Sequence, residues 1–501
     1  MKPNKNSTAE WLEKYERVPV WRKVKWREQD PWQLYLALTK ESGYAFIVES
    51  GRSGRYTYVG AEPVRTIQIK NGEIKENGGM AYQTLADPLA VVRRWMMHES
   101  SPSSRQVQEA GLPDWTGGAA GYLSYDTARY FEFFPRTAED DLQLPDVYLM
   151  MMEEVYAFDH ETKDIFLVVH AGQKARIQKE EDAEQRLVQM ESFLKETHVS
   201  NGTLPSLFGD IVDTGTASVS FAQHEFEQAV QKVQEYIAAG DVFQVNLSVR
   251  QTKEAASSAE EVYEVLRILN PSPYMGLLRF PEFQLVSASP ELLLQVKGNQ
   301  LSTRPIAGTR RRGKTEEEDA ELVRELLDNE KEVAEHIMLV DLERNDLGRV
   351  SRYGSVHVDE LMVVEKYSHV MHIVSNVIGE LADGKDMYDA IIAAFPGGTI
   401  TGAPKVRTME IIEELEPVTR GPYTGSMCLL GFTGDAVCNI IIRTMIVKDG
   451  QVHVQAGAGI VIDSIPKAEY YESLKKAEAV WKALSLSEAK KRRVRERRAE
   501  T

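Results

Sequence analysis

Two pairs of glutamates have the spacing expected of a divalent-metal site. The members of each pair lie three residues apart in a segment that we predict to be helical: Glu332 with Glu335, and Glu469 with Glu472. Side chains three residues apart project from the same helical face. Four carboxylates brought together would repel one another unless a cation lay among them, and oxygen ligands with open positions for an anionic substrate suit Mg2+. Glutamates at this spacing are also frequent on solvated helices, so the spacing alone favours a solvated role.

Two glycine-rich stretches have the composition of anion-binding loops. Residues 395–405 place three glycines and two threonines, among them Thr399, before a predicted helix start. Residues 455–459 include Gly457 and Gly459 at the end of a predicted strand. Backbone amides in such loops suit a carboxylate, and glycine lets the backbone approach a ligand closely. A simple tight turn is the alternative at both places, and the first stretch lacks the glycine spacing of a phosphate-binding Walker loop.

Arg443 and His372 are single polar residues in apolar surroundings. We predict a strand over 439–447 that consists of core residues apart from Arg443. A buried guanidinium needs an anionic partner, so either a substrate carboxylate or a structural acid must face it. Alternation places His372 on the strand face opposite Met371 and Ile373. This makes His372 a candidate proton donor, although a lone histidine more often has a hydrogen-bonded structural role.

The segments that must position these residues alternate between helical and extended patterns. Apolar residues at helical spacing predict a helix over 224–239 that ends at Gly240. Along 243–249, apolar and polar residues alternate, which predicts a strand with Gln244 on its polar face. A polar face on a central strand needs either solvent or a ligand, and the pattern leaves both alternatives open.

Caps and turn signals predict the remaining helices and a hairpin. Thr315 with Glu318 forms a capping box that opens a charged helix reaching at least His336. Further predicted elements are a helix between Pro404 and Pro417, a hairpin at Asp449 and Gly450, and a last helix from Pro466 through Trp481. Strands joined largely by hairpins, with helices interspersed, predict an α+β architecture rather than a doubly wound parallel sheet.

A change in composition divides the chain. Residues 197–220 are rich in Ser, Thr, Gly and Asp and cannot bury enough apolar surface to order themselves. With 501 residues, the chain also exceeds the usual span of one core. We therefore predict four parts: an N-terminal domain at 1–200, a linker or surface crossing at 201–220, a second domain at 221–487, and a basic C-terminal tail at 488–501. The tail is expected to be solvated, with a docking arm as the alternative.

Composition and charge exclude several classes of protein. The net charge of −17 argues against a nucleic-acid binder, whose phosphate-facing surface needs clustered Lys and Arg. Cys428 and Cys438 cannot build a disulfide framework and lack metal-ligand spacing, so we predict that both are buried, in a reducing compartment. The sequence shows neither the apolar core of a signal peptide nor a membrane span. We therefore predict a cytoplasmic protein with no membrane or nucleic-acid partner.

Five motifs together resemble one protein family. They are RPIAGTR at 304–310, AEHIMLVDL at 334–342, RNDL at 344–347, FPGGTITGAPK at 395–405 and QAGAG at 455–459. In this order they resemble the chorismate-utilising enzymes, which include anthranilate synthase component I, aminodeoxychorismate synthase component I, isochorismate synthase and salicylate synthase. The resemblance extends from about Tyr44 to Leu486 and implies an α+β fold of largely antiparallel sheets, packed as a sandwich with flanking helices. It also overrides the solvated alternative for the glutamate pairs.

The resemblance implies a role for each candidate residue. The residues that resemble the family's Mg2+ ligands are Glu335 and Glu472. The residues that resemble its catalytic groups are Glu332 and Glu469, at the metal or in proton transfer, Thr309, and His372, the general acid that assists departure of the ring hydroxyl. The residues that resemble its chorismate-binding groups are Tyr423, Arg443, Thr399, Gly457, Gly459, Lys476, Gln244 and Ala307.

Gln244 indicates which nucleophile attacks chorismate. It occupies the place where water-adding relatives carry a general-base lysine, which speaks against isochorismate or salicylate synthase and for ammonia. Relatives of this kind take ammonia from a separate glutamine amidotransferase subunit, and no glutaminase Cys-His-Glu arrangement is visible in the sequence. The resemblance therefore implies a glutamine amidotransferase partner.

Two sets of residues disagree on the amination product. Ala307 stands where aminodeoxychorismate synthases of the best-known type carry a nucleophilic lysine, and alanine there is typical of anthranilate synthases. Asn246 and Gly397, in contrast, resemble the aminodeoxychorismate form. Overall similarity favours the component I of Bacillus-type bacteria, which also carries this alanine, so we predict 4-amino-4-deoxychorismate for p-aminobenzoate and folate synthesis. Anthranilate is the alternative product, and a non-catalytic metabolite-binding subunit is the alternative from another class.

A second ligand site is implied in the N-terminal half. The residues that resemble the family's tryptophan pocket are Glu49, Ser50, Pro273, Tyr274 and Met275. In anthranilate synthases this pocket gives feedback inhibition, whereas in aminodeoxychorismate synthases a similar site can hold tryptophan structurally.

Overall fold

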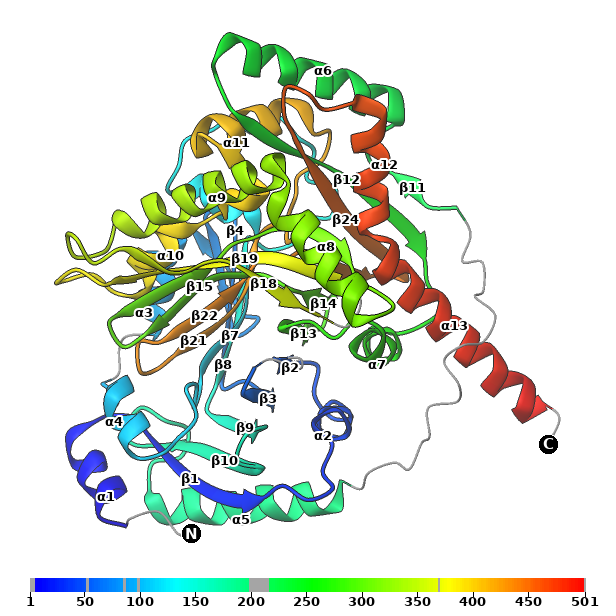
Figure 1. The fold of residues 1–501 in the computed structure, drawn as a ribbon. Helices are drawn as coiled ribbons and strands as arrows, with labels where there is room; N and C mark the ends of the chain where they lie inside the picture. Colours follow the sequence, from blue (N-terminus) through cyan, green and yellow to red (C-terminus); the bar gives the residue numbers. More distant parts are fainter. Residues whose placement is uncertain are drawn as a thin grey trace.

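Two large antiparallel sheets form the framework of the protein (Figure 1). The structure, a computed structural model, describes residues 5–50, 54–83, 87–96, 100–197, 216–367 and 370–499. Each sheet has 12 strands, and all neighbouring strands that the structure describes in them run antiparallel. Helices lie on the outer faces of the sheets. The predicted α+β class is therefore confirmed.

The strands of the first sheet, here called sheet 1, come from both ends of the sequence. Their order is β1 (Val18–Lys25), β10 (Asp164–Ala171), β9 (Glu154–Asp159), β3 (Tyr56–Ala61), β2 (Ala45–Glu49), β13 (Tyr274–Arg279), β14 (Gln284–Ser289), β23 (Thr444–Lys448), β24 (Gln451–Ile460), β12 (Gln244–Glu254) and β11 (Ser218–Val219), with β20 (Gly402–Ala403) also paired to β12.

The second sheet, sheet 2, is assembled in the same way. Its order is β17 (Ile306–Arg311), β19 (Val370–Glu380), β16 (Gln300–Arg304), β15 (Leu292–Lys297), β22 (Ala436–Asn439), β21 (Ser426–Gly431), β7 (Gly118–Leu123), β8 (Val147–Met152), β4 (Arg65–Lys70), β5 (Glu73–Glu76) and β6 (Tyr82–Gln83), with β18 (His357–Lys366) also paired to β19.

An apolar layer joins the two sheets. Phe46 and Phe166 of sheet 1 are fully or almost fully buried in one cluster with Tyr122 of sheet 2. Tyr148 of β8 stacks on Phe280, which follows β13, with 4.1 Å between the ring centroids. Because inward side chains of both sheets share this cluster, the molecule is the sandwich that the family resemblance implied.

Helices complete three further apolar clusters. On sheet 1 the covering helices are α2 (Pro31–Leu38), α5 (Glu180–Glu196), α7 (Ala259–Leu269) and α13 (Glu478–Ala499). On sheet 2 they are α3 (Pro88–Met96), α9 (Glu330–Gly348), α10 (Met387–Ala394) and α11 (Lys405–Leu415). At the β12–β24 end of sheet 1, α11 also packs with α6 (Gln223–Ala239) and α12 (Pro466–Lys476). The remaining helices are α1 (Lys5–Lys14), α4 (Ser104–Glu109), α8 (Glu316–Asp328), and the short 3-10 helices η1 (Tyr125–Tyr130) and η2 (Gly398–Ile400).

Both sheets cross the predicted domain boundary. In sheet 1, β2 pairs with β13, and in sheet 2, β7 pairs with β21. The segments 1–200 and 221–487 therefore share their sheets. Most of the predicted linker at 201–220 lies outside the described residues, and its end forms β11 against β12. The predicted tail at 488–501 is helical through Ala499, and Lys490 and Lys491 form ion pairs with acidic residues of α7.

Several local predictions are confirmed. Gly240 has a left-handed φ of 84° and ends α6, and the side chain of Thr315 accepts a hydrogen bond from the amide of Glu318 at the start of α8. Only this half of the predicted capping box is formed, because the Glu318 carboxylate accepts from the amide of Lys314 instead of that of Thr315. The hairpin between β23 and β24 turns at Asp449 and Gly450. Cys428 and Cys438 are both free and buried. Among the described residues, no helix combines the length and apolar character needed to cross a bilayer.

Four predicted elements need correction. The helix expected to run from Thr315 to His336 is interrupted at Asn329, whose side chain caps a new helix, α9. The last predicted helix is also interrupted, at Ala477 between α12 and α13, where the alanine has no side chain able to cap. Arg443 lies before β23 rather than within it, with a φ of 50°, and Phe243 is 71% exposed although its pattern predicted a buried face.

Asn329→Ala should destabilise the protein by removing the N-cap of α9. The Oδ1 atom of Asn329 accepts hydrogen bonds of 3.1 Å from the amides of Lys331 and Glu332. Loss of such a cap costs about 1 kcal/mol, so urea denaturation should show a free energy of unfolding lower by that amount. Asn329→Asp keeps an acceptor oxygen and should retain most of the stability. An equal loss in both variants would show that the cap is not the cause.

Candidate active site

The polar face of β12 lies against glycines of β24. Asn246 is in register with Gly459, and Ser248 with Gly457. A Cβ atom on Gly457 would lie 2.6 Å from Oδ1 of Asn246, and one on Gly459 would overlap Nε2 of Gln244. The two glycines therefore leave the space that the polar side chains of β12 occupy.

Four buried polar atoms at this end of the two sheets have no hydrogen-bond partner among the described residues. They are Oε1 of Gln244, Oδ1 of Asn246, Oγ1 of Thr399 and Oε1 of Glu291. Leaving a buried polar atom unpaired costs roughly 1–3 kcal/mol. Their convergence on one region is typical of a site whose polar partner is a ligand.

The first glutamate pair faces β12 and β17 from the start of α9. Nε2 of Gln244 lies 3.4 Å from Oε1 of Glu335, and Nη1 of Arg310 lies 3.2 Å from Oε1 of Glu332. Burial raises the pKa of Glu335, and the nearby carboxylate of Glu332 raises it further. Negative charge is thus held at this place without full compensation by the protein.

The second glutamate pair approaches the same region from α12. Nζ of Lys476 lies 3.0 Å from Oε1 of Glu472 and donates to the carbonyl of Gly457 at 3.0 Å. Burial raises the pKa of Glu469, with a further contribution from Glu472. Lys476 acts electrostatically on both Glu335 and Glu469, so the two pairs border one space.

Oxygen donors of this kind suit a hard divalent cation. Among the residues that the structure describes, however, no three acidic, histidine or cysteine side chains are arranged as a preformed metal site. The fit to Mg2+ therefore rests on the donor type and on the close approach of the Glu332 and Glu335 carboxylates, which adds to burial in raising the pKa of Glu335.

His372 and Thr309 meet across β17 and β19. Gly308, with a φ of 60°, interrupts the register between Ala307 and Thr309, and places the Thr309 hydroxyl 3.1 Å from Nδ1 of His372. Nδ1 also lies 3.0 Å from the carbonyl oxygen of Gly308. Because a carbonyl only accepts, Nδ1 must carry the proton, which leaves Nε2 bare in the neutral ring. Burial, assisted by Arg443, lowers the pKa of His372 to about 4.

Arg443 and Glu291 form an incompletely paired set beside Thr399. The Arg443 guanidinium makes no hydrogen bond or ion pair of its own with the described residues, and its pKa is lowered by burial. Burial raises the pKa of Glu291 to about 7, although Thr399 and Arg443 act in the opposite direction. Arg443 is therefore available to an anion, and Glu291 is able to carry a proton near neutral pH.

Glu291 was not among the residues selected from the sequence. It stands between the apolar strands β14 and β15, directly after Ser289 and Pro290, and is 6% exposed. An acid in an otherwise apolar run is the available signal for it. Two predicted groups show fewer contacts: Tyr423 is buried with its ring centre 5.6 Å from the Arg420 guanidinium, and Ala307 is buried in β17 opposite Ile373.

The residues selected as an effector site gather at a different place, around β2 and β13. Met275 is in register with Glu49. Both carboxylate oxygens of Glu49 are occupied, Oε1 by Arg267 at 2.6 Å and Oε2 by Arg267 and Tyr263 at 3.1 and 2.9 Å.

The rest of that set lies beside them. The hydroxyl of Ser50 donates to the carbonyl of Tyr56 at 2.7 Å. Pro273 directly precedes β13, and Tyr274 begins it, with a pKa raised to about 12 by burial. The carbonyl of Tyr274 accepts a hydrogen bond from Nδ2 of Asn439 at 2.9 Å.

Comparison with known protein families identifies the family to which the chain belongs. The profile of the family described as chorismate binding enzyme matches residues 43–482. The chain belongs to this family. The chain is an enzyme of that family. Chorismate is a polar, anionic ligand, which agrees with the unpaired polar groups of the site.

Named relatives fall into two groups. The chain is 48% identical to Aminodeoxychorismate synthase component 1 of Bacillus subtilis (strain 168), over 94% of this chain and 98% of the relative. It is 44% identical to Anthranilate synthase component 1 of Thermus thermophilus, over 95% of this chain and 99% of the relative. Both kinds of synthase are therefore close in sequence.

Solved structures agree on the fold. Anthranilate synthase component I of Streptococcus pneumoniae TIGR4 superposes with a TM-score of 0.74 at 37% identity, covering 85% of this chain and 92% of that one. The menaquinone-specific isochorismate synthase of Escherichia coli superposes with a TM-score of 0.66 at 18% identity, covering 96% and 98%. The second likeness concerns the fold alone.

Glu291→Gln should remove a titration from the pH profile of activity. If the protonated carboxyl of Glu291 donates a proton, kcat/KM for chorismate should fall as the pH rises through about 7, because the pKa of Glu291 lies there. The variant should lose roughly 10²- to 10⁴-fold in kcat/KM together with that limb.

Glu343→Gln is the matched control for this variant. Glu343 is also a buried acid, its pKa is raised to about 8 by burial, and its Oε2 accepts from Thr303 at 2.8 Å. It should keep the limb near pH 7. A limb that persists in Glu291→Gln would assign the titration to another group.

Proposed function

We propose that this enzyme aminates chorismate with ammonia to give 4-amino-4-deoxychorismate, the precursor of p-aminobenzoate and folate. The observation that best supports a dianionic substrate is the state of the Arg443 guanidinium. It has no protein hydrogen bond or ion pair among the described residues, and it lies beside Thr399 and Glu291. Asn246, Gly397 and the 48% identity to a named aminodeoxychorismate synthase support the amination at C4.

The two carboxylates of chorismate would bind at opposite sides of the site. Arg443 and the unpaired Oγ1 of Thr399 suit one carboxylate. Lys476, which lies beside the glutamate pairs of α9 and α12, suits the other carboxylate. Tyr423 and Gln244 would line the ring between them.

We further propose Glu335 and Glu472 as ligands of Mg2+, with Glu332 and Glu469 beside them. The ion would supply positive charge to the ring carboxylate of the substrate and to the crowded glutamates. Gln244 and Lys476 hold the glutamate side chains of α9 and α12 in place by the contacts at 3.4 and 3.0 Å. This assignment explains why so much negative charge faces an anionic substrate.

Departure of the C4 hydroxyl requires a proton. The family resemblance assigns this role to His372, yet its pKa of about 4 and the bare Nε2 atom leave it without a proton to give at neutral pH in the free enzyme. Glu291, with a pKa of about 7, supplies a protonated carboxyl in the same site. We therefore propose Glu291 as a second candidate donor, with His372 and Thr309 orienting the leaving group.

The nucleophile is proposed to be ammonia from a glutamine amidotransferase. The named relatives are each called component 1, which supports a second component. The methyl group of Ala307 offers no nucleophile, so the amination does not proceed through a covalent lysine adduct at this position. The C4–O bond breaks, the C4–N bond forms, and water leaves.

Anthranilate is the second candidate product. It is favoured by Ala307 and by the anthranilate synthases at 44% and 37% identity. Tryptophan is the candidate ligand of the Glu49 site in either case. To bind there through Glu49, its ammonium group would have to compete with Arg267 and Tyr263 for the carboxylate.

Product analysis should distinguish the two amination reactions. Purified protein with chorismate, MgCl2 and an ammonium salt should consume chorismate, and chromatography should show a product that an added aminodeoxychorismate lyase converts to p-aminobenzoate. Accumulation of anthranilate instead would overturn the proposed product. No consumption of chorismate under these conditions would support a non-catalytic binding subunit.

Glu335→Gln and Glu472→Gln should each abolish turnover, by at least about 100-fold, because a neutral amide is a poor ligand for Mg2+. Circular dichroism and the melting temperature should remain close to those of the unmodified protein, since both side chains are partly or fully exposed. Glu330→Gln, an exposed residue in the first turn of the same helix α9, should keep full turnover. Unchanged turnover in both variants would refute the proposed ligands.

A further inference from the structure

Arg420 is a buried arginine whose donors are all committed to the protein. Its side chain is 1% exposed. Nε and Nη2 donate to the two carboxylate oxygens of Glu416 at 2.9 and 2.7 Å. Nη2 also donates to the carbonyl of Asn246 at 2.7 Å, and Nη1 donates to the carbonyl of Ile400 at 2.9 Å and to Oγ1 of Thr424 at 3.4 Å. A guanidinium has five N–H groups, so none is left for a substrate.

Arg420 differs from Arg443 because all of its N–H donors are used within the protein. A buried arginine near an anion-binding site is easily taken for a ligand of the anion. Arg443 fits that role because its guanidinium makes no hydrogen bond or ion pair among the described residues. Arg420 does not fit it, because a substrate carboxylate would have to displace Glu416 from a bidentate, fully buried ion pair.

The acceptors of Arg420 belong to segments that carry proposed chorismate contacts. Ile400 follows Thr399 in η2, and Asn246 lies two residues after Gln244 in β12. Tyr423 precedes Thr424, and its ring centre lies 5.6 Å from the guanidinium. One side chain thus touches the backbone of two of these segments and the side chains of the third.

Glu416 extends the same connection to β24. Its Oε1 accepts from the amide and from the hydroxyl of Ser248, both at 2.8 Å. The hydroxyl of Ser248 in turn accepts from Nε2 of Gln455 at 2.9 Å. Ser248 is in register with Gly457, so the ion pair is connected to the glycine strand as well.

We propose that Arg420, together with Glu416, is a positioning residue that holds the turn at residues 421–424, here called the Tyr423 turn, at a set distance from η2 and β12 without contacting chorismate. The inference rests on the proposed use of Thr399, Gln244 and Tyr423 as chorismate contacts. Arginine is required because its planar fork meets acceptors in several directions at once, whereas lysine offers a single charged point.

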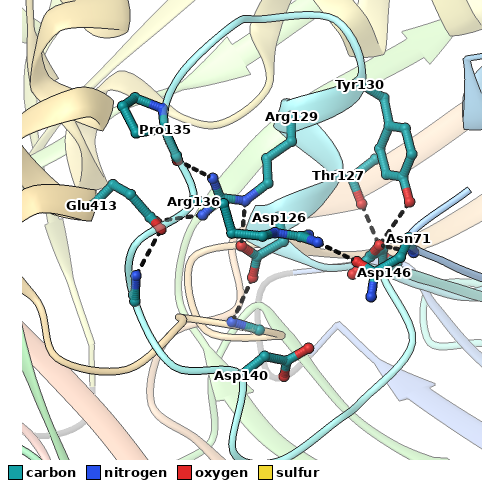
Figure 2. Close-up of polar contacts among 12 residues, drawn as sticks. Asn71, Asp126, Thr127, Arg129, Tyr130, Pro135, Arg136, Asp140, Asp146 and Glu413 are labelled. Carbon is teal, nitrogen blue, oxygen red and sulfur yellow. Dashed lines mark hydrogen bonds and ion pairs between the residues drawn. The ribbon is translucent and has the colours of Figure 1, made fainter.

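A neighbouring network contacts the same turn at Gly421 (Figure 2). The amide of Gly421 donates to Oδ2 of Asp126 at 3.0 Å, and Arg129 joins Asp126 to Glu413 of α11. Within the part of the chain that the structure describes, none of the hydrogen bonds of Asp126 and Arg129 reaches β12 or η2. This second network thus fixes the backbone of the turn at Gly421. The distance from the turn to η2 and β12 depends on Arg420.

The test compares Arg420→Lys with Arg17→Lys. Arg17 is equally buried and pairs with Glu153 at 2.9 Å, with side chains 2% and 3% exposed, but it lies directly before β1. Both variants should lower the melting temperature. Only Arg420→Lys should raise KM for chorismate, by tenfold or more, and lower kcat, when consumption of chorismate is measured well below both melting temperatures. KM in Arg17→Lys should stay within twofold of the original value.

A double-mutant cycle identifies the route of the effect. Thr399→Ala alone should raise KM, and the same change in the Arg420→Lys background should raise it much less, because the contact is already misplaced. Additive effects, or an unchanged KM in Arg420→Lys, would overturn the positioning role. Glu416→Gln keeps the size and one acceptor oxygen, and should shift KM in the same direction if Arg420→Lys fails to fold.

These outcomes are distinct from failure of the proposed function. Consumption of chorismate is recorded whichever product forms, so anthranilate as product leaves the positioning test unaffected. If Thr399→Ala and Tyr423→Phe both leave KM unchanged, the proposed substrate contacts are wrong. That result would also overturn the positioning role, even with a raised KM in Arg420→Lys, because the role rests on those contacts.

Discussion

The register between β12 and β24 is the constraint on which the site depends. Each residue of β12 from Val245 to Glu254 pairs with one of β24, and alternate side chains point to opposite faces. A slip by one residue would exchange the faces, turning Val245 and Leu247 toward the site and burying Gln244 in the apolar cluster beneath α6. Because residues 457 and 459 are glycines, the polar side chains of β12 can lie over β24 in this register without overlap. The contacts from Gln244 to Glu335 and from Ser248 to Glu416 follow from it.

Charge around the site is divided between groups that are satisfied within the protein and groups that are not. Arg420 and Glu416 neutralise each other in a fully buried, bidentate pair, and Asp346 is held by Lys405 at 2.6 Å. Arg443, Glu335 and Glu291 lack such partners, and their pKa values are displaced toward the neutral forms mainly by burial. Satisfied pairs give a rigid frame, whereas unsatisfied groups gain from a charged ligand. Under the proposed function, the same pattern leaves the Arg443 guanidinium available to an anionic substrate in an otherwise acidic protein.

Local features of the fold could be predicted from the sequence because their causes are local. Gly240 ends a helix through its own left-handed backbone, and Thr315 caps one through an amide three residues away. The split at Asn329 was missed because a capping side chain interrupts a pattern that is otherwise continuous. For the candidate site, motif resemblance selected the glutamates, Arg443 and Thr399, which remain predictions, but it did not select Glu291 or Arg420. The interactions of these two residues involve groups that are distant in the sequence. Arg443 acts electrostatically on Glu291, and Arg420 donates a hydrogen bond to the carbonyl of Asn246.

The sharing of both sheets by the two halves of the chain has a consequence for the Glu49 site. Because β2 pairs with β13, Glu49 lies beside Met275, and the carbonyl of Tyr274 is bonded to Asn439 at the end of β22. Asn439 precedes Ile440, whose amide donates to the carbonyl of Glu291 at 3.0 Å and whose carbonyl accepts from Ser289. Any ligand that displaced β13 would therefore act, through two hydrogen-bonded residues, on the loop that holds Glu291. Two separate domains with a flexible linker would transmit such a displacement poorly, whereas one continuous sheet resists bending and passes it to its neighbouring strands.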